Sequence, residues 1–336
     1  MACEVRVEMY QGLERIIIEN SRVVATLLPG KGADLLAFIW KATNTNCLYR
    51  SDTPIESLAK LDLQKQRLRN HSDYSLGGWM EALPHRGSYQ GFVLEQDNGG
   101  IAATLPWEYM ILKVSKDEAA VKVWVDLPIF PLRIEKIYKL TEREPEVLAI
   151  AETVVNIGSE QMDFTWTQHA LFGGEFLDGD VKVAVPSNSV FKAWEHIDCP
   201  GKALSAYEEA VAAVHLRQGC FDLRRALPKG CGDYEFVVYN SLEAGCAALI
   251  NEQMGLAVEL HFELEHFPYL RALYQHTEAG NVIGMEPSDD LFSGWEYSKK
   301  HGTYTSLAKG ECINTKFSLA YREIIKEDGR KKDGVS

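Results

Sequence analysis

Residues 163–172 read DFTWTQHALF, an apolar run in which aromatic and β-branched residues are frequent. This composition is typical of a β-strand. One titratable side chain, His169, stands near the end of the run. A second run of the same character, residues 282–288 (VIGMEPS), carries Glu286. A histidine and a carboxylate placed in this way would form a general acid and base pair if the fold brings the two runs together.

Most of the remaining chain also predicts strands, because apolar and β-branched residues alternate in short runs closed by Gly, Asn, Asp and Pro. The clearest runs are residues 15–19, 22–28, 33–40, 120–126, 133–140, 147–156, 181–185, 235–239, 256–264 and 315–321. Only two segments, residues 54–67 and 204–216, have the composition of helices. So many strands with so few helices predict an all-β fold of stacked antiparallel sheets.

The domain organisation follows from length and composition. The chain has 336 residues, 46% hydrophobic and 25% charged, which is enough for a large core. No Pro- or Ser-rich linker divides it, and no repeat of fixed period is present. We therefore predict one β-sandwich domain over residues 1–325, followed by a charged, frayed tail over residues 326–336.

Charge and hydropathy argue against several classes of partner. The net charge of −13 speaks against nucleic acid, whose recognition depends on clustered Lys and Arg. The sequence contains no apolar run long enough for a membrane span and no basic segment followed by an apolar core at its start, so we expect a cytoplasmic protein without a membrane partner. The seven cysteines are scattered without a C-x-x-C pair, so we expect reduced thiols and no metal site.

Several motifs occur together in a recognisable order. The segment 28–38 (LPGKGADLLAF) is followed by 77–84 (GGWMEALP), 105–108 (LPWE) and 131–134 (PLRI). The last third then contains 156–158 (NIG), 162–164 (MDF) leading to His169, 284–287 (GMEP) and 309–311 (KGE). In this order the sequence resembles the aldose 1-epimerase (galactose mutarotase-like) superfamily over nearly its whole length.

The resemblance implies a large antiparallel β-supersandwich and a defined reaction. Members of this superfamily interconvert the α and β anomers of a sugar by opening and reclosing its ring. Carried over to this chain, Glu286 would remove the O1 proton and His169 would protonate the ring oxygen. Both steps are proton transfers, so the resemblance implies no metal and no cofactor.

Further candidates for sugar binding surround the glycine turn at residues 77–78. Trp79 has the ring needed to stack on a sugar face, and its alternative role is a core-filling side chain after the glycine turn. His85 is the nearest replacement for a second substrate-facing histidine, which many mutarotases carry in a His-Gly segment that this chain lacks. The other candidates are polar or charged side chains of the same region: Glu81, Arg86, Arg69 and His71. The superfamily's substrate-binding aspartate has two possible counterparts, Asp222 and Asp233.

Three classes of function stay open at this point. The first is an isomerase acting on a free or modified small-molecule carbohydrate, as a monomer or homodimer. The second is a non-catalytic carbohydrate-binding or sensing protein on the same fold. The third is a glycoside hydrolase or polysaccharide lyase, although hydrolysis requires two carboxylates about 5 to 9.5 Å apart, and the pair identified here is a histidine and a glutamate. The sequence does not identify the sugar.

Overall fold

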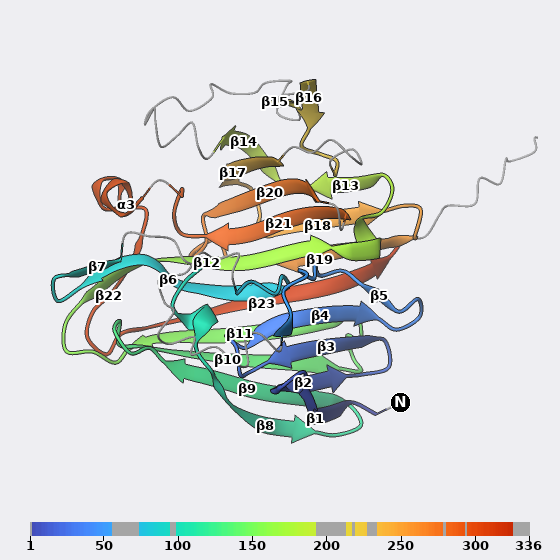
Figure 1. The fold of residues 1–336 in the computed structure, drawn as a ribbon, viewed down its shortest axis with the longest axis horizontal. Coiled ribbons are helices and arrows are strands. Elements are labelled where there is room, and N and C mark those ends of the chain that lie inside the picture. Colours follow the sequence, from blue (N-terminus) through green and yellow to red (C-terminus); the bar gives the residue numbers. More distant parts are fainter. Residues whose placement is uncertain are drawn as a thin grey trace, which may run out of the picture.

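The computed structural model describes residues 2–55, 74–94, 99–192, 213–216, 219–226, 234–277, 280–292 and 294–324. Within these residues two large antiparallel sheets lie face to face (Figure 1). The larger sheet runs in the order β1 (Glu4–Tyr10), β2 (Leu13–Glu19), β3 (Val23–Leu28), β4 (Asp34–Trp40), β6 (Trp79–Tyr89), β12 (Met162–Gly173), β21 (Gly280–Ser288), β20 (Tyr269–Thr277), β17 (Tyr234–Leu242) and β14 (Ser187–Lys192). Three short strands extend it: β5 (Thr45–Asn46) beside β4, β7 (Phe92–Leu94) beside β6, and β22 (Thr305–Leu307) beside β12.

The smaller sheet contains eight strands among the described residues. Its order is β13 (Val181–Ala184), β18 (Cys246–Asn251), β19 (Leu256–His261), β23 (Cys312–Glu323), β11 (Val147–Asn156), β10 (Leu132–Thr141), β9 (Glu118–Asp126) and β8 (Glu108–Val114). A separate hairpin is formed by β15 (Ala213–Leu216) and β16 (Gly219–Asp222). Short 3-10 turns, η2 (Ala102–Thr104) and η3 (Gly174–Leu177), and one helix, α3 (Trp295–His301), complete the described elements.

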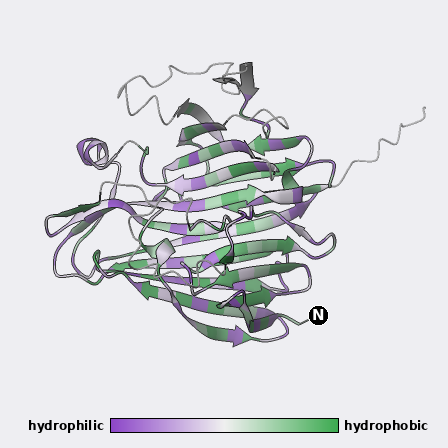
Figure 2. Cartoon of the chain, in the orientation of Figure 1, coloured by the Kyte–Doolittle hydropathy of each residue, from purple (hydrophilic) through white to green (hydrophobic). Residues whose placement is uncertain are grey.

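The main hydrophobic core lies between the two sheets. Successive side chains of a strand point to opposite faces, and the strands accordingly alternate hydrophobic and hydrophilic residues (Figure 2). Tyr321 of β23 illustrates the contact between the sheets. Its ring stacks on Phe38 of β4 at 5.1 Å between centroids, and its hydroxyl donates to the backbone oxygens of Phe38 and Thr45 at 2.8 Å each. Such contacts fix the two sheets against each other over the full core.

The central strands of the larger sheet are buried on both faces. In β6 every residue from Trp79 to Gly87 is buried, and β21 is buried from Val282 to its end. Additional chain therefore covers the outer face of the sheet at this point. On that face Leu291 and Phe292, which follow β21, pack against a cluster of buried apolar residues around Phe236 and Val238 of β17.

The all-β prediction is confirmed, and each strand run expected from the sequence corresponds to a strand of the structure. The helix predictions are wrong where the structure describes residues 213–216. Residues 56–67 and 204–212 lie outside the described residues, but residues 213–216 form strand β15 and not a helix, because they pair with β16. The tail at 326–336 also lies outside the described part. Helix α3 was missed, although Gly294 before it and Gly302 in the left-handed conformation after it are usual boundaries.

Within the described residues the structure has no helix with the length and apolar content needed to cross a membrane.

Candidate active site

His169 and Glu286 lie side by side on neighbouring strands. The pairs Thr167–Ser288 and Ala170–Met285 set the register of β12 against β21, and this register places His169 opposite Glu286. The Nε2 atom of the histidine is 3.4 Å from Oε1 of the glutamate. The histidine side chain is 19% exposed and the glutamate 4%. The fold thus brings a histidine and a glutamate more than a hundred positions apart in sequence into direct contact.

Both side chains point away from the core between the sheets. Their neighbours Ala170 and Met285 pack into that core, and strand alternation sends the residues beside them to the opposite face. Gly284 makes room for the pair. A Cβ atom at this position would lie 2.8 Å from Oε1 of Glu286 and 3.1 Å from Cβ of Leu273, so a side chain there would displace the carboxylate.

Two arginines and an aspartate extend the site beyond Glu286. Arg271 of β20 pairs with Glu286 across the ladder and is buried, and its Nη2 donates to Asp290. Nη1 of Arg86 lies 3.4 Å from the other oxygen of the same aspartate, and Ser288 donates to Asp290 at 3.0 Å. One carboxylate therefore anchors two guanidinium groups directly after the strand that carries Glu286.

The ring of Phe292 joins these groups. The guanidinium carbons of Arg86 and Arg271 lie 5.0 and 4.9 Å from its centroid, which is within the range of cation–π contacts. The His85 ring lies 5.8 Å from the same centroid, and Nδ1 of His85 is 3.3 Å from Nη1 of Arg86. The structure thus brings His85 and Arg86 together in one buried cluster with Arg271.

A β-bulge in β6 produces the position of His85. Arg86 of β6 pairs with Thr165 of β12, and the next paired residues are Ala82 of β6 and Thr167 of β12. Strand β6 therefore has three residues where β12 has one, and His85 is among them. Bulges of this kind redirect side chains and are frequent beside active sites.

Trp79 and Glu81 lie on the opposite face of the same strands. They pair with Ala170 and Gln168, whose side chains point into the core between the sheets. The indole of Trp79 donates to Oε1 of Gln168 at 2.8 Å, and the indole of Trp166 donates to Glu81. The structure places these two predicted site residues behind His169, on the far side of the strand. We therefore do not include them in the proposed site.

The buried network behind the strand is held together by one lysine. Nζ of Lys136 contacts Glu81 and lies 3.4 Å from Glu152, and Gln168 donates to both carboxylates. Burial and the nearby Glu81 raise the pKa of Glu152 well above its ordinary value. Burial opposes the charge of Lys136, but Glu152 and Glu81 outweigh it and raise its pKa. Lys136 thus stays charged, while Glu152 favours its neutral form.

The remaining predicted residues are accounted for as follows. Arg69, His71 and Asp233 lie outside the described residues. Asp222 lies in β16 and accepts from the Arg224 guanidinium at 2.9 Å. Arg271 and Asp290 were missed, although Arg271 carried the same signal as His169, a charged residue inside an apolar run.

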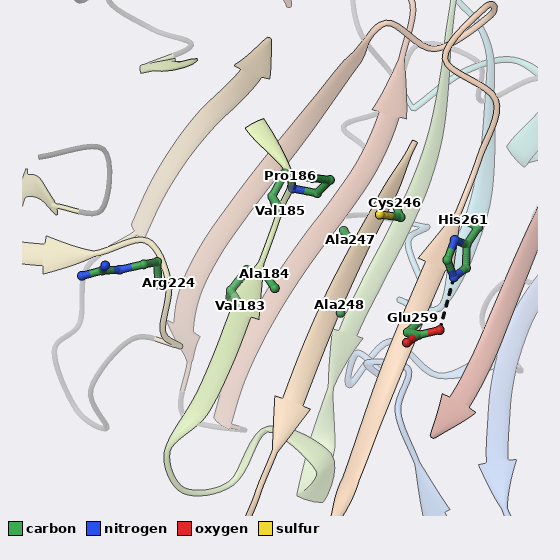
Figure 3. Close-up of a pocket in the computed structure, with 10 residues that line it drawn as sticks. All are labelled: Val183, Ala184, Val185, Pro186, Arg224, Cys246, Ala247, Ala248, Glu259 and His261. Carbon is green, nitrogen blue, oxygen red and sulfur yellow. Dashed lines mark hydrogen bonds and ion pairs between the residues drawn. The ribbon is translucent and has the colours of Figure 1, made fainter. Parts of the chain in front are cut away.

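A pocket of about 530 Å³ lies elsewhere, on the smaller sheet (Figure 3). Its lining comes mainly from β13, β18 and β19, with Arg224 at one side and the ion pair of His261 and Glu259 at another. None of the predicted site residues lines it. Among the described residues no group of three or more His, Cys, Asp or Glu side chains is arranged to hold a metal ion.

Comparison with known proteins identifies the fold. No family model and no curated protein matches the sequence, but solved structures match the whole architecture. A candidate aldose 1-epimerase from Klebsiella pneumoniae superimposes with a TM-score of 0.70 at 15% identity, covering 96% of this chain and 83% of that one. A galactose mutarotase-like protein from Clostridium acetobutylicum superimposes with a TM-score of 0.66 at 12% identity, covering 96% of this chain and 99% of that one. A galactose mutarotase-like protein from Lactobacillus casei superimposes with a TM-score of 0.56 at 17% identity, covering 92% of this chain and 100% of that one.

The chain therefore has the galactose mutarotase-like fold. This confirms, at the level of the fold, the resemblance seen in the sequence.

Proposed function

We propose that this chain is an isomerase of the aldose 1-epimerase type, which interconverts the anomers of a small-molecule carbohydrate. The observation that carries the proposal is the contact between His169 and Glu286, 3.4 Å apart on one sheet face. The hydroxyl oxygen O1 and the ring oxygen of an aldose are bonded to the same carbon. A base for one oxygen and an acid for the other must therefore lie next to each other, as these two side chains do.

The proposed reaction begins with Glu286 removing the proton of the O1 hydroxyl. The imidazolium of His169 gives its proton to the ring oxygen as the bond from C1 to that oxygen breaks, leaving an open-chain aldehyde. Rotation about the bond from C1 to C2 presents the other face of the carbonyl. Ring closure then reverses both transfers: His169 recovers its proton, and protonated Glu286 returns its proton to O1. No electron is gained or lost, and each group ends as it began.

The geometry disfavours glycoside hydrolysis. The two hydrolytic carboxylates must flank the bond, about 5 to 9.5 Å apart. Here the partner of Glu286 is a histidine in direct contact, and the nearby Asp290 is bound to two arginines. The second candidate function is a carbohydrate-binding protein without catalysis, which the same fold would also support.

Mutation of the pair tests the proposal. Glu286→Gln keeps the shape and removes the base, and His169→Asn removes the proton donor, so each should lower the anomerisation rate about 100-fold or more. The rate is followed by polarimetry or NMR on freshly dissolved α-anomers of glucose, galactose, xylose and their 6-substituted forms.

The chain provides a matched control for these substitutions. His261 and Glu259 also bring a histidine and a carboxylate to 3.3 Å, within strand β19 of the other sheet, so His261→Asn and Glu259→Gln should leave the rate unchanged. A wild-type protein that binds one of these sugars without accelerating its mutarotation would contradict the isomerase and favour the binding protein.

A further inference from the structure

The two sheets end side by side in strands with exposed apolar residues. Strand β1 closes one end of the larger sheet and β8 one end of the smaller sheet, and the two are in contact (Figure 1). Among the described residues, β1 pairs only with β2, and β8 pairs only with β9. Six large apolar side chains on these strands are between 37% and 66% exposed: Val7, Met9, Met110, Ile111, Leu112 and Val114. A long, apolar, open edge of this kind is a template for pairing with another strand.

Strand β8 carries one charge of each sign, near its opposite ends. Glu108 pairs with Trp124 of β9 on the outer face of the sheet. A register shift around Leu112 then makes Lys113 pair with Ala120, which belongs to the same face as Trp124. The shift therefore returns Lys113 to the face of Glu108, and the residues between them are apolar or aromatic.

This pattern is complementary to itself. Leu112 is the extra residue at the register shift, so Lys113 takes the next position after Ile111. If two copies of β8 pair antiparallel about Met110, Glu108 of each copy therefore faces Lys113 of the other, and Tyr109 faces Ile111. Opposite charges facing each other across strands stabilise a pair, whereas like charges destabilise it. Parallel alignment would instead place each charge beside its own equivalent. A lysine and a bulge are features by which edge strands avoid indiscriminate pairing, and here they restrict the edge to a partner with a matching carboxylate.

We propose that this chain forms a two-fold symmetric dimer in which the β8 edges of two copies pair antiparallel and join their smaller sheets. The occupant of the edge is a second copy, because a two-fold interface uses the same surface patch on both subunits and this patch is self-complementary. A specific interface usually buries about 800 Å² per partner, which requires more than one strand. The adjoining β1, with Val7 and Met9, belongs to the same interface. The proposal does not depend on the isomerase activity.

Sedimentation velocity of the full chain over a range of concentrations tests the dimer. Wild-type protein should sediment with twice the 37.7 kDa mass of the chain at micromolar concentration. Met110→Lys places two lysines face to face on the symmetry axis, and should weaken the dimer at least 100-fold. Because Met110 is exposed, the variant should keep the wild-type circular dichroism spectrum and melting temperature. Phe92→Lys, at an exposed position on β7, is the matched control and should leave the dimer intact.

Charge exchange tests the register. Glu108→Lys and Lys113→Glu should each weaken the dimer about 10-fold or more, because each places like charges opposite one another. The double variant Glu108→Lys/Lys113→Glu should restore it. A monomeric wild-type protein at all concentrations would overturn the proposal, and so would a dimer that Met110→Lys leaves unchanged. Failure of the double variant to recover would overturn the antiparallel pairing of β8.

Discussion

Lys136 offers the sharpest test of how the two sheets are held together. Its side chain is 4% exposed and lies between Glu81 and Glu152, which are 1% and 0% exposed. Lys136→Met keeps the volume and removes the positive charge that lies between these two carboxyl groups. Breaking a buried ion pair by removing one partner usually costs about 3–5 kcal/mol.

Proton uptake sets a limit on that cost. A carboxyl group with the ordinary glutamate pKa of 4.5 requires about 3.4 kcal/mol to be protonated at pH 7, so the variant can relieve its unpaired charge by binding one proton. We therefore expect a loss of about 3–4 kcal/mol in the free energy of unfolding at pH 7. The loss should shrink by about 1.4 kcal/mol for each unit by which the pH is lowered, until the carboxyl group is protonated in the unfolded chain as well.

Urea denaturation followed by tryptophan fluorescence measures this loss, because Trp79 and Trp166 both belong to the network. The companion variant Lys136→Met/Glu81→Gln removes the unpaired charge and retains hydrogen-bonding atoms, so it should recover most of the stability. A single-variant loss below about 1 kcal/mol, or a loss independent of pH, would refute the reasoning.

Two further predictions concern Gly284 of β21, the strand that carries Glu286, and Asp289 directly after that strand. Burial raises the pKa of Asp289 from 3.8 to about 7, against the hydrogen bonds from Thr305 and the Trp166 amide. The folded protein therefore binds a proton that the unfolded chain has released, and this group's contribution to stability, present below about pH 4, is lost as the pH rises through about 7. Asp289→Asn should flatten the profile of unfolding free energy between pH 5 and pH 8 by as much as ~2.7 kcal/mol, because about two pH units of that range lie below the folded pKa of about 7. Urea denaturation measures the profile, and an unchanged slope would contradict the shift. Gly284→Ala should lower kcat for anomerisation about 10-fold or more, because its Cβ would displace the Glu286 carboxylate, and wild-type kcat in this variant would argue against the position of Glu286 seen here.

The strands could be predicted from the sequence because most of them have one face in the core and one in solvent. Strand β10 alternates regularly, with each buried residue followed by a less buried one. Alternation of this kind appears directly in the sequence as a period of two. The helices were harder to predict. The composition of residues 204–216 favoured a helix, but residues 213–216 pair with β16, and pairing in the folded chain outweighs local propensity.

The candidate site was only partly predictable, for a related reason. The strand runs identified His169 and Glu286, but no period distinguishes the two faces of β6 and β12, because both faces are buried. The sequence therefore does not show whether a charged or aromatic residue on these strands points to the site or into the core between the sheets. Trp79 and Glu81 were therefore grouped with His85 and Arg86, although the structure places the two sets on opposite sides of the sheet.

Strand β12 separates these two sides and connects the buried charges behind it with His169 in front of it. Gln168 points backward and binds Glu81 and Glu152, while the next residue, His169, points forward to Glu286. A one-residue slip of a strand would move each of its side chains to the opposite face of the sheet. The hydrogen bonds of Gln168 on the core side therefore help to hold the register that points His169 to the outer face. Sites built on strands position their groups more accurately than sites on loops, provided that the supporting residues are themselves fixed. For the proposed site, that support would be the buried network of Lys136, Glu81, Glu152 and Gln168 behind β12.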